Sequence, residues 1–157
     1  MPDIFDLASL TKALVTTPLI LREFNLVGQD DLRLSDYFYH PKASKWYSEA
    51  PDYQLKSLLF HQSGLPPWRN LWIDEALFRR KQWILDPEEG YEKLNRAIVC
   101  NKRSSEFLYS DIGYILLGFA LEGKFSQGLK EVYEHYCKEE LNLTTLDELC
   151  FLPSKKL

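Results

Sequence analysis

An apolar stretch over residues 7–26 constrains the fold of this chain more than any other feature. Nearly every side of a helix built from it would be hydrophobic, and a helix of that kind is buried inside a larger body. Pro18 lies within the stretch, and proline removes a backbone donor from a helix interior. We therefore expect a central helix over residues 8–26, which Pro18 kinks or divides into two pieces.

The rest of the chain also predicts helices rather than strands. After a polar turn at residues 28–36, a short helix is expected over 53–61, with Leu55, Leu58 and Leu59 facing inward. A Ser-Gly-Leu-Pro-Pro run at residues 63–67 ends it. Further helices are predicted over residues 74–83, 87–100, 112–121 and 128–141, with Gly123 and Gly128 between the last two, and short strands or extended segments at 4–7 and 106–109.

Composition narrows the classes of function. The chain has 157 residues and a net charge of −4 without a basic block, so a nucleic-acid surface is not expected. No apolar run reaches the length of a membrane span. A secretion signal needs a basic start followed by an apolar run, and Asp3 and Asp6 stand there instead. These two features predict a cytoplasmic chain. The three cysteines, Cys100, Cys137 and Cys150, include no C-x-x-C pair, so we expect free thiols and no metal site.

Ser9 and Lys12 are the first candidates for chemistry. They stand three residues apart at the start of the predicted helix, so the hydroxyl and the amine can meet on one face. A serine becomes a useful nucleophile when a neighbouring base accepts its proton, and a neutral lysine can be that base. The spacing alone equally fits a serine that caps the helix and a solvated lysine.

A second candidate group is the run of Tyr109, Ser110 and Asp111 before a strongly apolar helix. Asp111 is well placed to cap that helix, and Tyr109 could be a core residue. The functional interpretation makes Tyr109 a proton relay facing Ser9, with Ser110 and Asp111 as polar contacts for a substrate. His61 is interpreted as a structural histidine at the C-terminal end of a helix, where a positive charge favours the dipole.

Three segments in order carry a resemblance to a known family. They read FDLASLTK at residues 5–12, LLFHQSGLP at 58–66 and YSDIGYILLG at 109–118. The chain resembles serine β-lactamases and penicillin-binding proteins, in the branch that contains class C β-lactamases, D-alanyl-D-alanine carboxypeptidases and related esterases. The resemblance implies acyl-enzyme formation on a β-lactam, a D-Ala-D-Ala peptide or an ester, without a metal or an organic cofactor.

The same resemblance implies roles for individual residues. Ser9 would be the acylated nucleophile, Lys12 its base or proton partner, and Tyr109 the tyrosine that helps to move the proton to the leaving group. Asp111 stands where the family usually has asparagine, and an anion there would keep Lys12 protonated, which is unfavourable for a base.

A larger departure is the missing third motif, a Lys/His-Thr-Gly sequence that the family carries on a strand beside the active site. No such motif follows Tyr109. Residues 1–157 are thus expected to form one partial domain, the mainly α half of the family's α/β fold, with most of the antiparallel sheet missing and a helical region over 53–141. We expect such a chain to be weakly active or inactive alone, because losing one oxyanion donor costs about 10²–10³ in rate.

Two other functions stay open at this point. One is a non-catalytic helical module that binds a protein or a peptide, and the other is a remnant without an independent role. An uncovered face where the sheet belongs would favour a protein partner or self-association.

Overall fold

The computed structural model describes residues 7–28, 31–37, 52–68 and 106–143. Across these ranges the protein is helical, with one isolated bridge and no strand, which confirms the mainly α prediction. The helices predicted over 74–83 and 87–100 lie outside these ranges, as does the extended candidate at 4–7 except for Leu7. The elements are a π-helical turn η1 (Lys12–Thr16), α1 (Thr17–Val27), a 3-10 turn η2 (Leu34–Asp36), α3 (Leu55–Leu59), α6 (Asp111–Phe125) and α7 (Leu129–Glu139).

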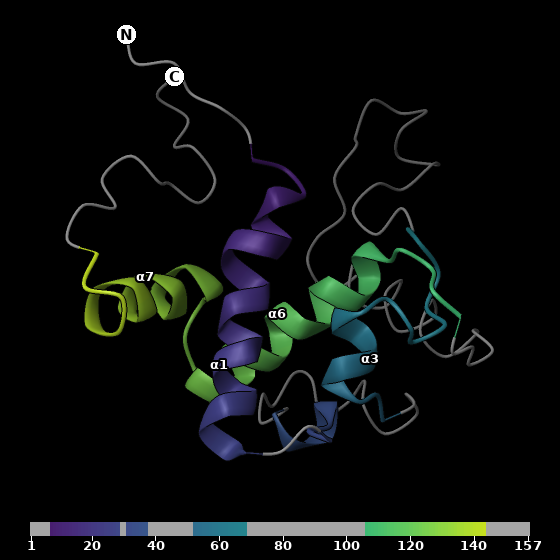
Figure 1. Cartoon of the computed structure of the whole chain (residues 1–157), viewed down its shortest axis with the longest axis horizontal. Helices are drawn as coiled ribbons and strands as arrows, with labels where there is room; N and C mark the ends of the chain where they lie inside the picture. Colours follow the sequence, from purple (N-terminus) through teal and green to yellow (C-terminus); the bar gives the residue numbers. More distant parts are fainter. Residues whose placement is uncertain (1–6, 29–30, 38–51, 69–105, 144–157) are drawn as a thin grey trace, which may run out of the picture.

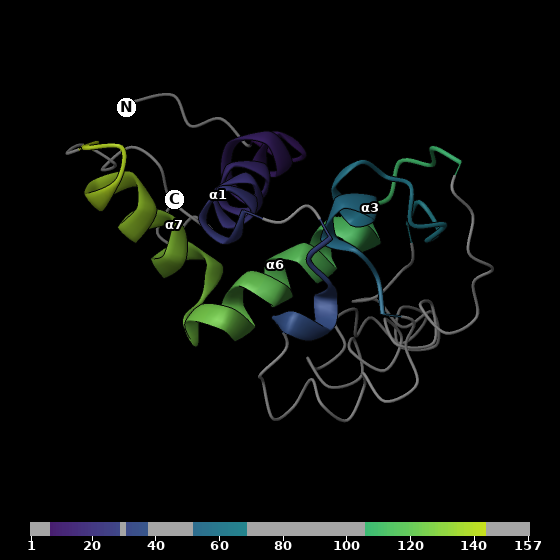
Figure 2. The same ribbon diagram turned by 60° about the horizontal axis from the view of Figure 1, so that its bottom comes forward.

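Helix α6 lies at the centre of this arrangement. It passes across α1, with α3 beside its first turns and α7 folding back from its far end (Figures 1 and 2). Its apolar residues point in all directions and are covered by these neighbours, as expected for a helix that is hydrophobic all round. The break expected at Gly123 is wrong, because this residue is buried and the helix continues to Phe125. Buried α6 residues are Ile112, Gly113, Leu116, Leu117, Gly118, Ala120, Leu121 and Gly123.

The first helix is covered on one side only. Val15, Leu19 and Ile20 are buried, whereas Leu10 and Leu14 on the opposite side are about half exposed. The expectation that this helix is enclosed on all sides is therefore wrong for the part of the chain that the structure describes. The reason is geometric, since α6 crosses it on a single face.

Pro18 changes the type of this helix without interrupting it. In η1 the backbone N–H of Thr17 bonds to the carbonyl of Lys12, five residues back. Pro18 then lies in the first turn of α1, directly after the π-helical turn. The two pieces expected here are thus a π-helical turn and an α-helix that follow each other directly.

The segment after α1 contains more than a polar turn. Gly28 ends α1 with φ of 66°, a left-handed conformation that glycine adopts readily. Leu32 and Leu34 are buried, and the backbone N–H of Leu34 donates to the carbonyl of Tyr53 at 2.8 Å. Residues 31–37 therefore pair with the segment that leads into α3, a contact that a short local pattern cannot predict.

The helix expected over 53–61 is shorter in the structure, and its inward side is confirmed. Leu55, Leu58 and Leu59 of α3 are all buried and pack towards α6. Of the two alternatives for 106–109, the strand is wrong, because these residues form no ladder. Their backbone instead follows the loop after α3, where the N–H of Leu108 donates to the carbonyl of His61 at 2.8 Å.

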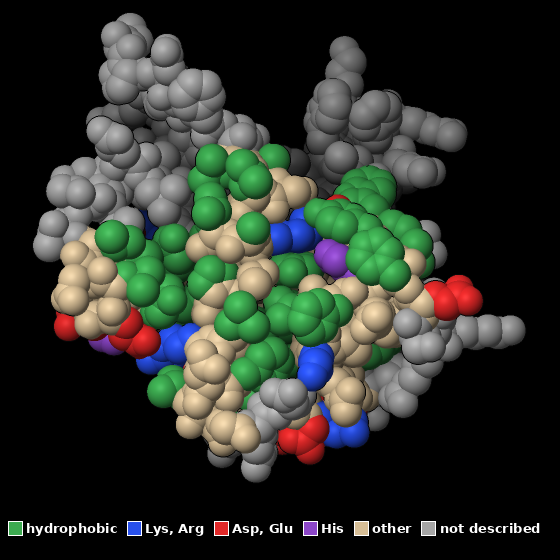
Figure 3. Space-filling view, viewed as in Figure 1, with side chains coloured by type: hydrophobic (Ala, Val, Ile, Leu, Met, Phe, Trp, Pro, Cys, Tyr) green, Lys and Arg blue, Asp and Glu red, His purple; other side chains and the backbone are tan. Residues whose placement is uncertain are grey.

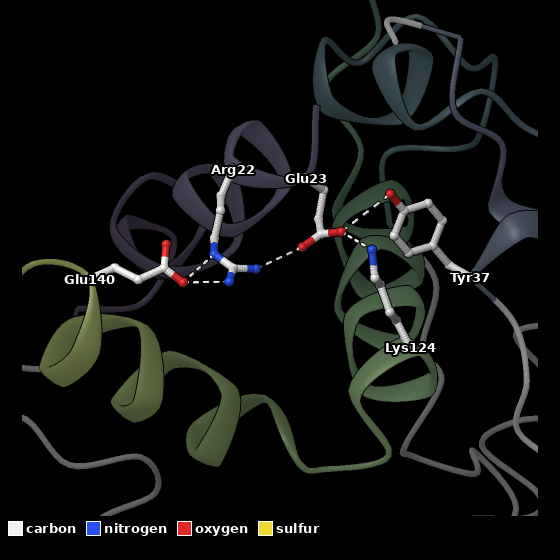
Figure 4. Close-up of polar contacts among 5 residues, drawn as sticks. All are labelled: Arg22, Glu23, Tyr37, Lys124 and Glu140. Carbon is white, nitrogen blue, oxygen red and sulfur yellow. Dashed lines mark hydrogen bonds and ion pairs between the residues drawn. The ribbon is translucent and has the colours of Figure 1, made fainter. Parts of the chain in front are cut away.

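A buried carboxylate joins α1 to α6 and to η2. The Glu23 side chain is 1% exposed and pairs with Arg22 at 2.9 Å and with Lys124 of α6 (Figure 4). The Tyr37 hydroxyl donates to the same carboxylate at 3.4 Å, and burial next to this anion raises the pKa of the Tyr37 phenol. Arg22 also pairs with Glu140, which follows α7. Charges that are buried are stabilised only when partners of this kind surround them.

Replacing this carboxylate should destabilise the fold. In Glu23→Gln, the amide NH₂ would face either Arg22 or Lys124, each of which is itself a donor, so a bond is lost and the charge is no longer balanced. We expect the free energy of unfolding, measured with urea, to fall by about 1–3 kcal/mol. Glu140→Gln is the matched control, because Glu140 is 35% exposed and its pair should contribute less than about 1 kcal/mol. Equal losses in the two variants would contradict this account.

Candidate active site

Ser9 and Lys12 lie on a single turn at the N-terminal end of the first helix. The backbone N–H of Lys12 donates to the carbonyl of Ser9 at 3.1 Å, and the Lys12 Nζ donates to the Ser9 Oγ at 3.4 Å. Ala8, directly before Ser9, has φ of 43°. Such a left-handed conformation is strained for a residue with a Cβ, and strain of this type gathers at functional sites.

Lys12 is the electrostatic centre of the site. Its Nζ lies 2.6 Å from the Oδ1 of Asp111 and 5.3 Å from the centroid of the Tyr109 ring. Partial burial alone would lower the pKa of Lys12, but hydrogen bonds to Asp111 and Tyr109 outweigh it, and the pKa is raised. The lysine is therefore protonated at neutral pH, in agreement with the effect expected of an anion at position 111.

Tyr109 shares this cluster with Ser9 and Lys12. Hydrogen bonds from Ser9 and Lys12, together with the positive charge of Lys12, lower the pKa of the Tyr109 phenol. Tyr109 is 44% exposed, so it is not the core residue that the simpler interpretation allowed. The structure thus brings Ser9, Lys12 and Tyr109 together from two segments that are far apart in the sequence.

Ser110 and Asp111 occupy different places from those expected. Ser110 is the N-cap of α6, where its Oγ accepts the N–H of Gly113 at 3.2 Å and donates to the carbonyl of Pro66 at 2.7 Å. Its side chain is therefore buried and not placed to contact a substrate, contrary to expectation. Asp111, expected to be the cap, is the first residue of α6, and its carboxylate faces Lys12.

His61, expected as a structural histidine at a helix end, is a neighbour of the site. It follows α3, which ends at Leu59, and its Nδ1 accepts the backbone N–H of Ser110 at 3.0 Å. Burial and the positive charge of Lys12 lower its pKa, so the charged histidine expected at a helix end is not what the structure holds. No spacing in the sequence relates position 61 to position 110, and only the packing of α3 on α6 shows their contact.

The surface beside the site is largely apolar. Figure 3 shows hydrophobic side chains over the face of the molecule that carries α1 and the start of α6. Leu10 is 57% exposed and Phe107 is 70% exposed. The described ranges contain no group of His, Cys, Asp or Glu side chains placed to hold a metal ion. None of the helices in them has both the length and the apolar character that a membrane span requires.

Comparison with known proteins places the chain in a family. A family model described as Beta-lactamase matches residues 3–144. Among solved structures, the chain is similar to FmtA from Staphylococcus aureus, with 22% sequence identity and a TM-score of 0.47. That match covers 85% of this chain and 34% of FmtA, so the chain spans about a third of the length of that protein. None of the curated proteins matches the chain. Because the family model covers most of its length, the chain belongs to the beta-lactamase family.

Proposed function

We propose that this chain carries the nucleophile end of a serine acyl-transfer site. Ser9 attacks the carbonyl of a β-lactam, a D-Ala-D-Ala peptide or an ester, and an acyl-enzyme forms on its Oγ. The observation that carries the proposal is the convergence of the Ser9 hydroxyl, the Lys12 ammonium and a Tyr109 phenol of lowered pKa. A hydroxyl beside a base with a cationic neighbour is the arrangement that activates a weak nucleophile.

Tyr109 is the better proton acceptor in this cluster. Lys12 is held in its protonated form by Asp111, so it has no lone pair to accept a proton. A Tyr109 phenolate can take the Ser9 proton as the Oγ–carbonyl bond forms, and it returns that proton to the leaving group when the amide, lactam or ester bond breaks. Lys12 then serves as the cation that stabilises the phenolate.

Asp111 moderates the reactivity of this pair. Its negative charge raises the pKa of Tyr109 and so opposes the effect of Lys12 and Ser9. The phenolate form that accepts a proton is therefore less populated at neutral pH than it would be without the carboxylate. We infer from this that acylation of Ser9 is slow at neutral pH and rises with pH.

The direct test is the covalent labelling of Ser9. The purified chain is incubated with a fluorophosphonate and, separately, with a penicillin, and its intact mass is measured. We expect one adduct with each reagent, located at Ser9 by peptide mapping and lost in Ser9→Ala. Ser57→Ala is the matched control, because Ser57 lies on α3 with its hydroxyl bonded to the carbonyl of Gln54, and it should label like the wild type.

Absence of an adduct from a sample that is folded by circular dichroism would overturn the acyl-transfer proposal. The alternative would then be a non-catalytic module that binds a protein or a peptide. Labelling that persists in Ser9→Ala would assign the nucleophile to another residue and would equally contradict the proposal.

Removing the charge at position 111 should accelerate this labelling. In Asp111→Asn the pKa of Tyr109 falls, because the anion that raises it is gone, so the phenolate is populated at lower pH. We expect roughly a three- to tenfold faster reaction of Ser9 with the fluorophosphonate at pH 7, and a rate profile displaced to lower pH. Tyr109→Phe should abolish the pH dependence. An unchanged or slower reaction in Asp111→Asn would show that Tyr109 is not the base.

A further inference from the structure

We propose that His61 is a positioning residue that holds Tyr109 against Ser9 and Lys12. The inference deepens the proposed function, on which its importance for acyl transfer rests. His61 does not touch the reacting atoms in this account. It acts through the backbone and the ring of Tyr109.

Hydrogen bonds to His61 fix the backbone on both sides of Tyr109. The carbonyl of His61 accepts the N–H of Leu108 at 2.8 Å, and its Nδ1 accepts the N–H of Ser110 at 3.0 Å. The residues before and after the tyrosine are therefore attached to a single residue of the loop after α3. This attachment restrains the backbone from which the phenol projects towards Lys12.

Ring contacts restrain the side chain as well. The His61 ring lies 4.4 Å from the Tyr109 ring, centroid to centroid, and 5.1 Å from the ring of Tyr114. Tyr114 is itself anchored, since its hydroxyl donates to the carbonyl of Leu59 at 3.1 Å and lies 3.2 Å from the Oγ1 of Thr17. The imidazole thus connects the exposed phenol to a side chain that is fixed on α3 and α1.

The protonation state of His61 fits this role. An Nδ1 that accepts a hydrogen bond carries no proton, so the ring is neutral with its hydrogen on Nε2. Charged and titratable groups around it include Lys12 and Asp111, in addition to the phenols of Tyr109 and Tyr114. A protonated imidazole would lose the bond to Ser110 and would face the Lys12 ammonium.

The backbone of His61 supports the same inference. Its φ of 57° lies in the left-handed region, which costs free energy for a residue with a side chain. The two hydrogen bonds to residues 108 and 110 offset that cost, because both depend on the turn of the chain at position 61.

The test compares variants that share the left-handed backbone preference and differ in the acceptor. Asparagine and glycine both tolerate positive φ, and the Oδ1 of asparagine can replace Nδ1, whereas glycine offers no side-chain acceptor. His61→Asn should thus lose the ring contacts but keep the backbone of Tyr109 in place through the bond to Ser110, and His61→Gly should release both. If His61→Gly does not melt cooperatively, His61→Leu takes its place in the comparison. Leucine fills part of the volume of the imidazole ring and offers no side-chain acceptor.

Two measurements report whether Tyr109 keeps its position beside Ser9 and Lys12. The first is the pKa of its phenol, followed by NMR of tyrosine labelled with ¹³C at Cζ and assigned with Tyr109→Phe. The second is the rate at which the fluorophosphonate labels Ser9. In His61→Gly we expect the Tyr109 pKa to rise towards the ordinary tyrosine value and the labelling to slow roughly tenfold, while in His61→Asn the rate should stay within about threefold of the wild type.

The outcomes separate this inference from the proposed function. An equal Tyr109 pKa in the wild type, His61→Asn and His61→Gly would overturn the positioning role, even if the melting temperature falls, because a merely structural role lowers stability alone. If Ser9 of the wild type is not labelled at all, the proposed function fails, and the NMR titration still decides whether His61 holds Tyr109.

Discussion

The structure depends on the need to bury helix α6 on all sides. Because its apolar residues point in every direction, α1, α3 and α7 pack around it, with α3 at its first turns and α1 reaching from Tyr114 to Lys124. Covering the first turns with α3 brings the loop after α3 to the N-terminal end of α6. Covering the other side with η1 and α1 brings Lys12 to the same end, where it meets Asp111. The candidate site is therefore a consequence of how one helix is enclosed.

Two groups of charges serve different purposes because their burial differs. Glu23 is removed from water and is surrounded by donors from several elements, so its network fixes how α1, α6 and η2 lie together. Lys12 and Asp111 remain in contact with solvent, and their pairing acts mainly on proton affinities nearby. The first network contributes to stability. The second sets which side chain of the site can accept a proton.

Local patterns in the sequence predicted what depends on local geometry. The inward side of α3 follows from residue spacing, as does the approach of Lys12 to Ser9, and the charge at Asp111 indicated that Lys12 stays protonated. What could not be predicted depends on contacts between distant segments. Lys124 is the partner of Glu23 across 101 positions, and His61 contacts Ser110 across 49. The exposed side of the first helix was missed for the same reason, because a run of hydrophobic residues does not reveal which distant segments pack against it.

The π-helical turn at Lys12–Thr16 determines the direction in which the candidate nucleophile faces. Each residue of an α-helix advances the chain by about 100° around the axis. A π-turn holds one residue more than an α-turn, so it rotates everything before Thr17 relative to the buried side of α1. Ser9 is thus directed towards Tyr109 by a difference in helix type several residues away. The length of this turn therefore matters to the site as much as its side chains do, because removing one residue would rotate Ser9 by about 100° around the helix axis, away from Tyr109.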